Sequence, residues 1–431
     1  MNPSDITWML ISTALVVLMT PALGFFYAGL VRGKNALNTI MMSVISLGFV
    51  GLAWALFGYS IAFAGDHPFL GGIDHLGLRD VGLEPRGTIP HLLFMAYQGT
   101  FAIITAALIS GAIVERVRFA PYLVVLTVWS VVVYSPVAHW VWGAGGWLAA
   151  LGALDFAGGT VVHITAGAAA CVAALCLGPR QDYSRRALLP HSVPFTLLGA
   201  GLLWFGWFGF NGGSAQAANA QAVLAFVNTL LAPSGALVAW TLLDLFRTGR
   251  ATAVGVATAI VVGLVAITPG AGFVSPLSAI AIGAVAVVPS YYALVWRVRT
   301  RLDDALDVGA AHGLGGISGA LLTGLLAQRA WGSPADGLLF GNPAQVGIQL
   351  VAVLVAGGYS ALLTLGIVRA MDAITQMRAA PEEEAIGLDV SEHGEEAYAR
   401  EDGAILILSP KASPQRVAAL TPSLTSQGET R

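Results

Sequence analysis

Eleven apolar stretches, each long enough to cross a lipid bilayer, dominate this sequence of 431 residues. About 20 apolar residues span the hydrocarbon core of a membrane, and a soluble domain has no use for many such stretches. The residues AVILMFWYC make up 56% of the chain and charged residues only 10%, against roughly 25% charge in a soluble globular protein. We therefore expect an all-α integral membrane protein with eleven transmembrane helices.

The first apolar stretch begins close to the N-terminus, and short polar loops separate the stretches that follow. Residues 1–7 contain no Lys or Arg, and no cleavage-site pattern follows, so the first stretch is expected to be a permanent span and not a removable signal peptide. The expected helices cover residues 6–30, 39–64, 89–114, 120–142, 156–177, 193–210, 217–243, 251–268, 275–296, 308–326 and 344–367.

Basic residues are distributed unevenly between the two sets of loops, and basic loops stay on the cytoplasmic side of a membrane. The loops after the odd-numbered stretches carry Arg32, Lys34, Arg116, Arg118, Arg180, Arg185, Arg186, Arg247, Arg250, Arg297, Arg299 and Arg301. The loops on the other side carry only Arg79, Arg86 and Arg329. This asymmetry predicts that the N-terminus lies outside the cell and the C-terminus inside.

The composition changes near residue 370, where the apolar stretches end and a Pro-Glu-Glu-Glu run begins an acidic segment. We expect a transmembrane domain over residues 1–370 and a cytoplasmic C-terminal tail over residues 371–403. The end of the chain, residues 404–431, is rich in Ser, Pro, Thr and Gln. Such a segment has too little apolar surface to bury and is expected to be a disordered extension.

Two histidines occur inside apolar stretches in matching contexts. Asp155 precedes His163 by eight residues, and Asp304 precedes His312 by eight, in the fifth and tenth stretches. Those stretches run in opposite directions, which predicts an inverted five-helix repeat followed by an eleventh helix. At about 1.5 Å per residue, each histidine lies about 12 Å inward from its aspartate, so both imidazoles are expected near the middle of the membrane.

An imidazole inside a membrane span is energetically costly, so its default role is functional, although packing against a neighbouring helix is an alternative. The net charge of −3, without any basic cluster, gives no indication of nucleic-acid binding. The apolar stretches contain no HExxH, GxSxG or paired aspartates at helical spacing, which argues against an intramembrane hydrolase. We therefore expect a protein that is not an enzyme and has no cofactor, metal or catalytic residue.

Several motifs together resemble the ammonium transporter (Amt) family, from the first stretch to about residue 400. They are Gly29-Leu-Val-Arg-Gly-Lys-Asn35, Gln98-Gly-Thr-Phe101, Gly111-Ala-Ile-Val-Glu-Arg116, Leu154-Asp-Phe-Ala-Gly-Gly-Thr-Val-Val-His163, Gly206-Trp-Phe-Gly-Phe-Asn211 and Gly387-Leu-Asp-Val-Ser-Glu-His-Gly394. The resemblance implies a homotrimer in the cell membrane, in a bacterium the inner membrane, that takes up ammonium or its analogue methylammonium.

The resemblance also implies a site for the cation at the external mouth, formed by Trp142, Ser214, Phe101 and Tyr97. Trp is the strongest cation-π partner, and a Ser oxygen accepts an ammonium N–H. Tyr97 stands where family members often have Phe, and it adds a hydroxyl near this mouth. Below the mouth, the resemblance implies a gate of two stacked rings, Phe101 and Phe210. Taken alone, Trp142 is more often an interfacial anchor, and either Phe is more often part of a packed core.

Beyond the gate, the ion must lose its proton, because a charge in a medium of low dielectric constant is far more costly than neutral ammonia. His163 and His312 are then expected to line the pore and to hydrogen-bond to each other and to ammonia. Asp155 begins the fifth stretch, where its carboxylate is expected to cap the helix and to favour a cation near the mouth.

The family resemblance suggests partners and alternatives. The tail segment 387–394 is similar to the part of the family that contacts the cytoplasmic face and a PII-type nitrogen-signalling protein, although an acidic stretch is often only solvated. A Rhesus-type gas channel shares the paired histidines, but Trp142 and Ser214 favour an ammonium transporter. An ammonium sensor acting through a cytoplasmic partner is the other alternative, because the tail is too short to hold a signalling domain.

Overall fold

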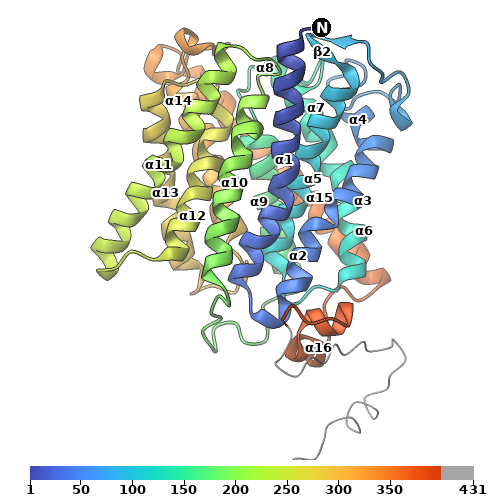
Figure 1. Ribbon diagram of the computed structural model, residues 1–431, viewed down its shortest axis with the longest axis vertical. Helices are drawn as coiled ribbons and strands as arrows, with labels where there is room; N and C mark the ends of the chain where they lie inside the picture. The colour runs from blue at the N-terminus through green and yellow to red at the C-terminus, as the bar shows by residue number, and fades with distance from the viewer. Residues whose placement is uncertain (399–431) are drawn as a thin grey trace, which may run out of the picture.

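The computed structural model describes residues 1–398 and is a bundle of long helices that stand side by side (Figure 1). Within these residues, eleven helical segments are long and apolar enough to cross a membrane, which confirms the all-α fold with eleven spans. The spans are Pro3–Leu30, Gly33–Phe63, His91–Ile113, Phe119–Leu151, Gly159–Leu177, Val193–Gly213, Ala220–Thr248, Ala253–Gly270, Pro276–Arg297, Gly309–Leu326 and Ala344–Ile374. The extension predicted over residues 404–431 lies outside the described residues.

Six spans are single α-helices: α1 (Pro3–Leu30), α5 (His91–Ile113), α10 (Val193–Gly213), α11 (Ala220–Thr248), α13 (Pro276–Arg297) and α15 (Ala344–Ile374). The others combine shorter helices: α2 (Ala36–Val44), α3 (Ser46–Ala53) and α4 (Tyr59–Phe63); α6 (Phe119–Trp129), α7 (Ser135–Trp142) and α8 (Trp147–Leu151); α9 (Thr165–Leu177); α12 (Ala253–Ile267); and α14 (Gly315–Leu326). Wider π-helical turns interrupt the second and fourth spans at η2 (Trp54–Gly58) and η4 (Ser130–Tyr134), and they begin the fifth and tenth spans at η5 (Gly159–Ile164) and η7 (Gly309–Leu314). Such turns often occur at functional sites, and η5 and η7 carry the two histidines.

The two ends of the bundle differ. The N-terminus, the short hairpin of β1 (Pro85–Arg86) and β2 (Ile89–Pro90), and α8 lie at one end, which we call the N-terminal face. The short helix α16 (Pro381–Ile386) lies at the other end, which we call the tail face (Figure 1).

Two helices extend further than their apolar stretches predicted. α11 continues to Thr248 instead of residue 243, and α15 continues to Ile374 instead of residue 367. Polar residues end the apolar stretch without ending the helix. On α11, Asp244 accepts hydrogen bonds from the Thr252 backbone N–H and hydroxyl, so it holds the start of α12.

Glycines allow the spans to approach closely. Gly199, Gly206 and Gly209 on α10 all face α1, and a Cβ atom at any of them would overlap α1 atoms. Close backbone approach of this kind stabilises membrane helices, because lipid tails provide little hydrophobic drive for helices to associate.

The tail packs against the tail face along most of its described length. The Asp389 carboxylate accepts hydrogen bonds from the backbone N–H groups of Leu37 and Asn38, 3.1 and 2.7 Å away, and so caps the start of α2. Lys34 donates to the backbone oxygens of Glu384 and Ala385. The predicted tail is therefore docked on the loops of the bundle as far as η10 (Asp389–His393).

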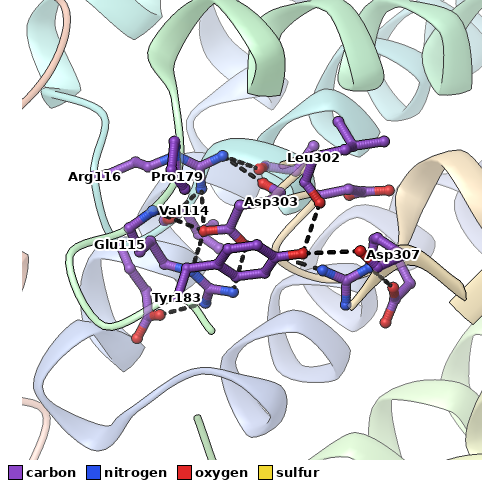
Figure 2. A network of polar contacts seen from close by, with 12 residues as sticks. Val114, Glu115, Arg116, Pro179, Tyr183, Leu302, Asp303 and Asp307 are labelled. Carbon is purple, nitrogen blue, oxygen red and sulfur yellow. Dashed lines mark hydrogen bonds and ion pairs between the residues drawn. The ribbon is translucent and has the colours of Figure 1, made fainter. Parts of the chain in front are cut away.

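A buried ion cluster joins three tail-face loops (Figure 2). Arg180 donates two side-chain hydrogen bonds of 2.8 Å to Asp303 and one of 2.6 Å to Glu115. Burial raises the pKa of Glu115 and Asp303, but the neighbouring arginines outweigh it and hold both pKa values below their usual range. Arg116, fully buried beside Asp303, completes the cluster.

Candidate functional site

A cavity of about 380 Å³ opens at the N-terminal face. Trp142, Ser214, Phe101 and Asp155 line it, so the structure brings these predicted site residues together. The indole N–H of Trp142 donates a 2.9 Å hydrogen bond to the backbone oxygen of Asp155, which fixes the orientation of the ring. We call this cavity the mouth.

Asp155 caps the fifth span as expected. Its carboxylate accepts four backbone hydrogen bonds of 2.7 to 3.0 Å, from residues 158 to 161 at the start of that span. Burial raises the pKa of Asp155 to about 6, and these four N–H donors act in the opposite direction. The four N–H donors therefore stabilise the ionised form of this carboxylate at the edge of the mouth.

The Tyr97 hydroxyl is tied to the end of α10. It lies 3.0 and 2.8 Å from the backbone oxygens of Gly209 and Phe210, and 3.3 Å from the Ser214 hydroxyl. Ser214 in turn donates to the Phe210 oxygen, so its own oxygen keeps lone pairs free to accept a hydrogen bond. Tyr97 is fully buried and holds Ser214 from below, although it is absent from the lining of the mouth.

Two stacked phenylalanine rings close the bottom of the mouth. The centroids of Phe101 and Phe210 lie 4.1 Å apart with 26° between the planes. Both side chains are at most 1% exposed, so they block the path in this conformation. The Phe101 ring meets Trp142 edge-on, with centroids 6.1 Å apart.

Directly below Phe210, the two histidines face each other. Their Nδ1 atoms are 3.2 Å apart, so one ring donates and the other accepts, and both rings cannot be imidazolium at once. His163 stacks on Phe210 at 6.0 Å and on Trp207 at 5.4 Å between centroids. Its Nε2 atom has no hydrogen-bond partner among residues 1–398.

Glycine explains how the histidines come so close. Gly167 lies one turn after His163, and a Cβ atom there would overlap the backbone of Gly313, which follows His312. The crossing of the fifth and tenth spans therefore occurs at backbone contact distance. Matching aspartates open both spans, since Asp304 accepts hydrogen bonds from Val308 and Gly309 as Asp155 does on its own span.

The space around the histidines is narrow, and it widens again toward the tail face. The cavity that both imidazoles line measures about 10 Å³, about the least that holds one water molecule. A second wide cavity of about 630 Å³, which we call the vestibule, begins at His312 and extends to Arg185 and Arg186. Two wide cavities thus meet at a constriction formed by the Phe pair and the His pair.

Trp207 and Gln98 are site residues that the sequence reasoning missed. Trp207 stacks on His163, and its indole donates to Thr268, so it holds the imidazole plane. Gln98 lines the mouth with a buried side-chain oxygen that has no partner among the described residues. Gln98 lies within the motif 98–101 and Trp207 within the motif 206–211, but only neighbouring positions of these motifs were assigned to the site. The sequence therefore did contain a signal for both residues.

Eleven spans around two cavities that meet at a histidine pair define a membrane transport protein. The sequence model of the Ammonium Transporter Family matches residues 7–398. Ammonium transporter Amt1 of Archaeoglobus fulgidus is 45% identical over 399 residues, covering 92% of this chain and 100% of the relative. The ammonium transporter of Aquifex aeolicus is 49% identical over 405 residues, covering 92% and 94% of the two chains.

Solved structures with a similar fold point to the same family. Mep2 of Candida albicans has a TM-score of 0.84 at 36% identity, covering 89% of this chain and 87% of that one. A protein described as a sensor Amt protein has a TM-score of 0.85 at 31% identity, covering 90% and 98%. The chain belongs to the ammonium transporter family. It is thus a multi-pass membrane protein and a transporter, not an enzyme.

Proposed function

We propose that this ammonium transporter recruits the ammonium ion at the mouth, removes its proton at the Phe gate, and passes ammonia along the histidine pair into the vestibule. The observation that carries the proposal is the Nδ1 contact of His163 and His312, at the constriction between the two wide cavities. A titratable pair at the narrowest point suits a substrate that differs from its conjugate base by one proton.

The mouth recruits the cation through three complementary groups. Trp142 offers its ring face, a contact worth about 0.5 to 2 kcal/mol, and Ser214 offers a hydroxyl oxygen. The ionised Asp155, buried behind Trp142, adds a negative potential without reaching into the path, because its oxygens are occupied by backbone N–H groups.

The gate separates the ion from the dry lumen. An alkylammonium has a pKa of about 10.4 in water, and desolvation lowers it. An ammonium ion that leaves the mouth and enters the space between Phe101 and Phe210 therefore loses its proton readily, and neutral ammonia moves on. The hydrogen-bonded imidazoles below can accept that proton at one nitrogen and release another toward the vestibule.

Two alternatives fit less well. A Rhesus-type gas channel does not require a cation site, whereas this mouth combines Trp142, Ser214 and an ionised carboxylate. An ammonium sensor acting through a cytoplasmic partner is favoured only by the likeness to a sensor Amt protein at 31% identity.

We assign the N-terminal face to the outside and the tail face to the cytoplasm, because the basic loops lie on the side of the tail. From the family membership we further propose that the protein forms a homotrimer in a bacterial inner membrane, with one pathway in each chain. The inverted repeat gains support from the matched aspartate caps of the fifth and tenth spans.

Replacing Trp142 by Leu should weaken the selection of ammonium over potassium, because a π-face that holds the dehydrated cation is lost. We expect a loss of about 2-fold to 30-fold, the range that about 0.5 to 2 kcal/mol implies. The measurement is uptake of labelled methylammonium against increasing potassium. Trp331→Leu, partly exposed outside the mouth, is the control, and unchanged competition in Trp142→Leu would remove this ring from the recruitment site.

We further propose that the docked tail regulates transport and forms part of the binding surface of a PII-type nitrogen-signalling protein. Truncation before Glu382 removes the Asp389 cap of α2 and the contacts of Lys34. We expect reduced uptake and loss of binding to a purified PII-type protein. Truncation after Tyr398 keeps every described tail contact and should leave both unchanged, whereas full uptake and binding in the shorter chain contradict this role.

A further inference from the structure

An apolar groove of about 570 Å³ lies outside the transport pathway, toward the tail face. Helices α13 and α15 flank it, and the fifth and tenth spans form its floor. Its lining residues are Ile164, Gly167, Ala168, Cys171, Ala293, Trp296, Arg297, Thr300, Leu302, Asp304, Gly309, Ala310, Gly313, Leu314, Ile317, Val353, Leu354, Gly357, Gly358 and Ala361. The groove starts beside the residues that follow His163 and His312, and it reaches the end of α13.

The groove opens to the membrane and not to the lumen. Trp296 and Leu354 on its rim are 67% and 64% exposed, although both belong to membrane spans. Gly358 also lies on this rim, and a Cβ atom there would meet no atom within 4 Å. Apolar surface at this depth contacts either hydrocarbon chains or another protein chain.

The charges at the tail-face end indicate which occupant fits. Arg299 and Arg301 flank Thr300, which lines the groove; both arginines are exposed and form no ion pair within residues 1–398. The acidic residues that follow, Asp303 and Asp304, are at most 1% exposed and are engaged by Arg180 and by backbone N–H groups. The exposed charge next to Thr300, at the tail-face end of the groove, is therefore positive, and it lies at the level of lipid headgroups.

We propose that the groove binds an anionic phospholipid, with an acyl chain along α15 and the headgroup beside Arg299 and Arg301. Apolar walls take the chain, and two unpaired guanidinium groups take the phosphate. The inner end of the bound chain packs against Ile164 and Gly313, directly behind the two histidines. This site is independent of how ammonium is carried.

Native mass spectrometry of the delipidated protein, titrated with phosphatidylglycerol or with phosphatidylcholine of the same chains, tests the site. Gly358→Leu fills the groove and should lose one bound lipid per chain. Gly366→Leu, eight residues further along α15 and equally free of neighbours, is the matched control and should keep it. Equal lipid binding by the two variants would overturn the proposal.

The charge is tested separately. Wild type should prefer phosphatidylglycerol by about tenfold or more, and Arg299→Gln with Arg301→Gln should lose that preference. Arg185→Gln with Arg186→Gln, an exposed pair of the vestibule, should retain it. If Gly358→Leu changes the oligomeric state while lipid binding stays intact, a second copy of the chain covers the groove and the proposal fails. If Gly358→Leu does not fold, the double variant of Arg299 and Arg301 decides, because a retained headgroup preference in that variant overturns the proposal.

Discussion

Folded His163→Leu and His312→Leu should each carry no ammonium-evoked current. Leu has similar size and keeps the lumen narrow, but it removes the nitrogen pair 3.2 Å apart through which we propose that a proton passes. The measurement is labelled methylammonium uptake together with current, normalised to the amount of folded protein. His163→Glu restores a titratable group whose charge stabilises a cation in the lumen, so we expect it to conduct with altered selectivity.

A packing role for the histidines leads to a different outcome. Trp207 and Phe210 stack on His163, so its loss removes ring contacts as well as a relay. If packing is the whole role, the variants lose stability and the yield of folded protein falls, while the surviving protein transports normally. Thermal stability measured beside transport therefore separates the two roles.

Asp303→Ala should be among the most destabilising single changes in this chain. Its carboxylate is fully buried and balances Arg180, so removal leaves a buried guanidinium short of its partner. Loss of one member of a buried ion pair costs about 3 to 5 kcal/mol. The check is the thermal unfolding midpoint of the purified protein in detergent.

Asp182→Ala provides the matched control, because its carboxylate pairs with Arg32 but is 37% exposed; such a pair is worth about 0 to 1 kcal/mol.

The folded-state pKa of Asp303 lies below its unfolded value. The contribution of this carboxylate to the free energy of unfolding is therefore complete above the unfolded value of about 3.9, and it disappears as pH falls through the folded pKa. Equal midpoints for Asp303→Ala and Asp182→Ala at pH 7 would contradict the importance of the cluster.

Hydropathy alone predicted the spans well, because bilayer thickness sets their length. It failed where helix ends depend on distant partners. The second span was expected from residue 39, yet α2 begins at Ala36, where the Asp389 carboxylate caps it from far along the chain. α11 also continues past the end of its apolar stretch, for a local reason: the polar residue Asp244 remains helical and caps the start of the next helix.

The sequence predicted which residues belong to the site better than it predicted how these residues contact one another. The repeated Asp and His spacing indicated two imidazoles at one depth, and the structure adds their Nδ1 contact, which depends on the absence of a side chain at Gly167. The sequence placed Tyr97 among the substrate-binding residues of the mouth, whereas the structure ties its hydroxyl to the end of α10 and leaves the residue out of the lining. The tail-face ion cluster escaped prediction because Glu115, Arg180 and Asp303 come from three distant loops.

The most direct test of the proposed pathway is the current across a bilayer that contains the purified protein, recorded with and without an ammonium gradient. If the histidine pair relays the proton that the gate removes, wild type gives an inward current that scales with labelled uptake, and His312→Leu gives none. Ammonium-evoked current of wild-type size in folded His163→Leu and His312→Leu would contradict the account.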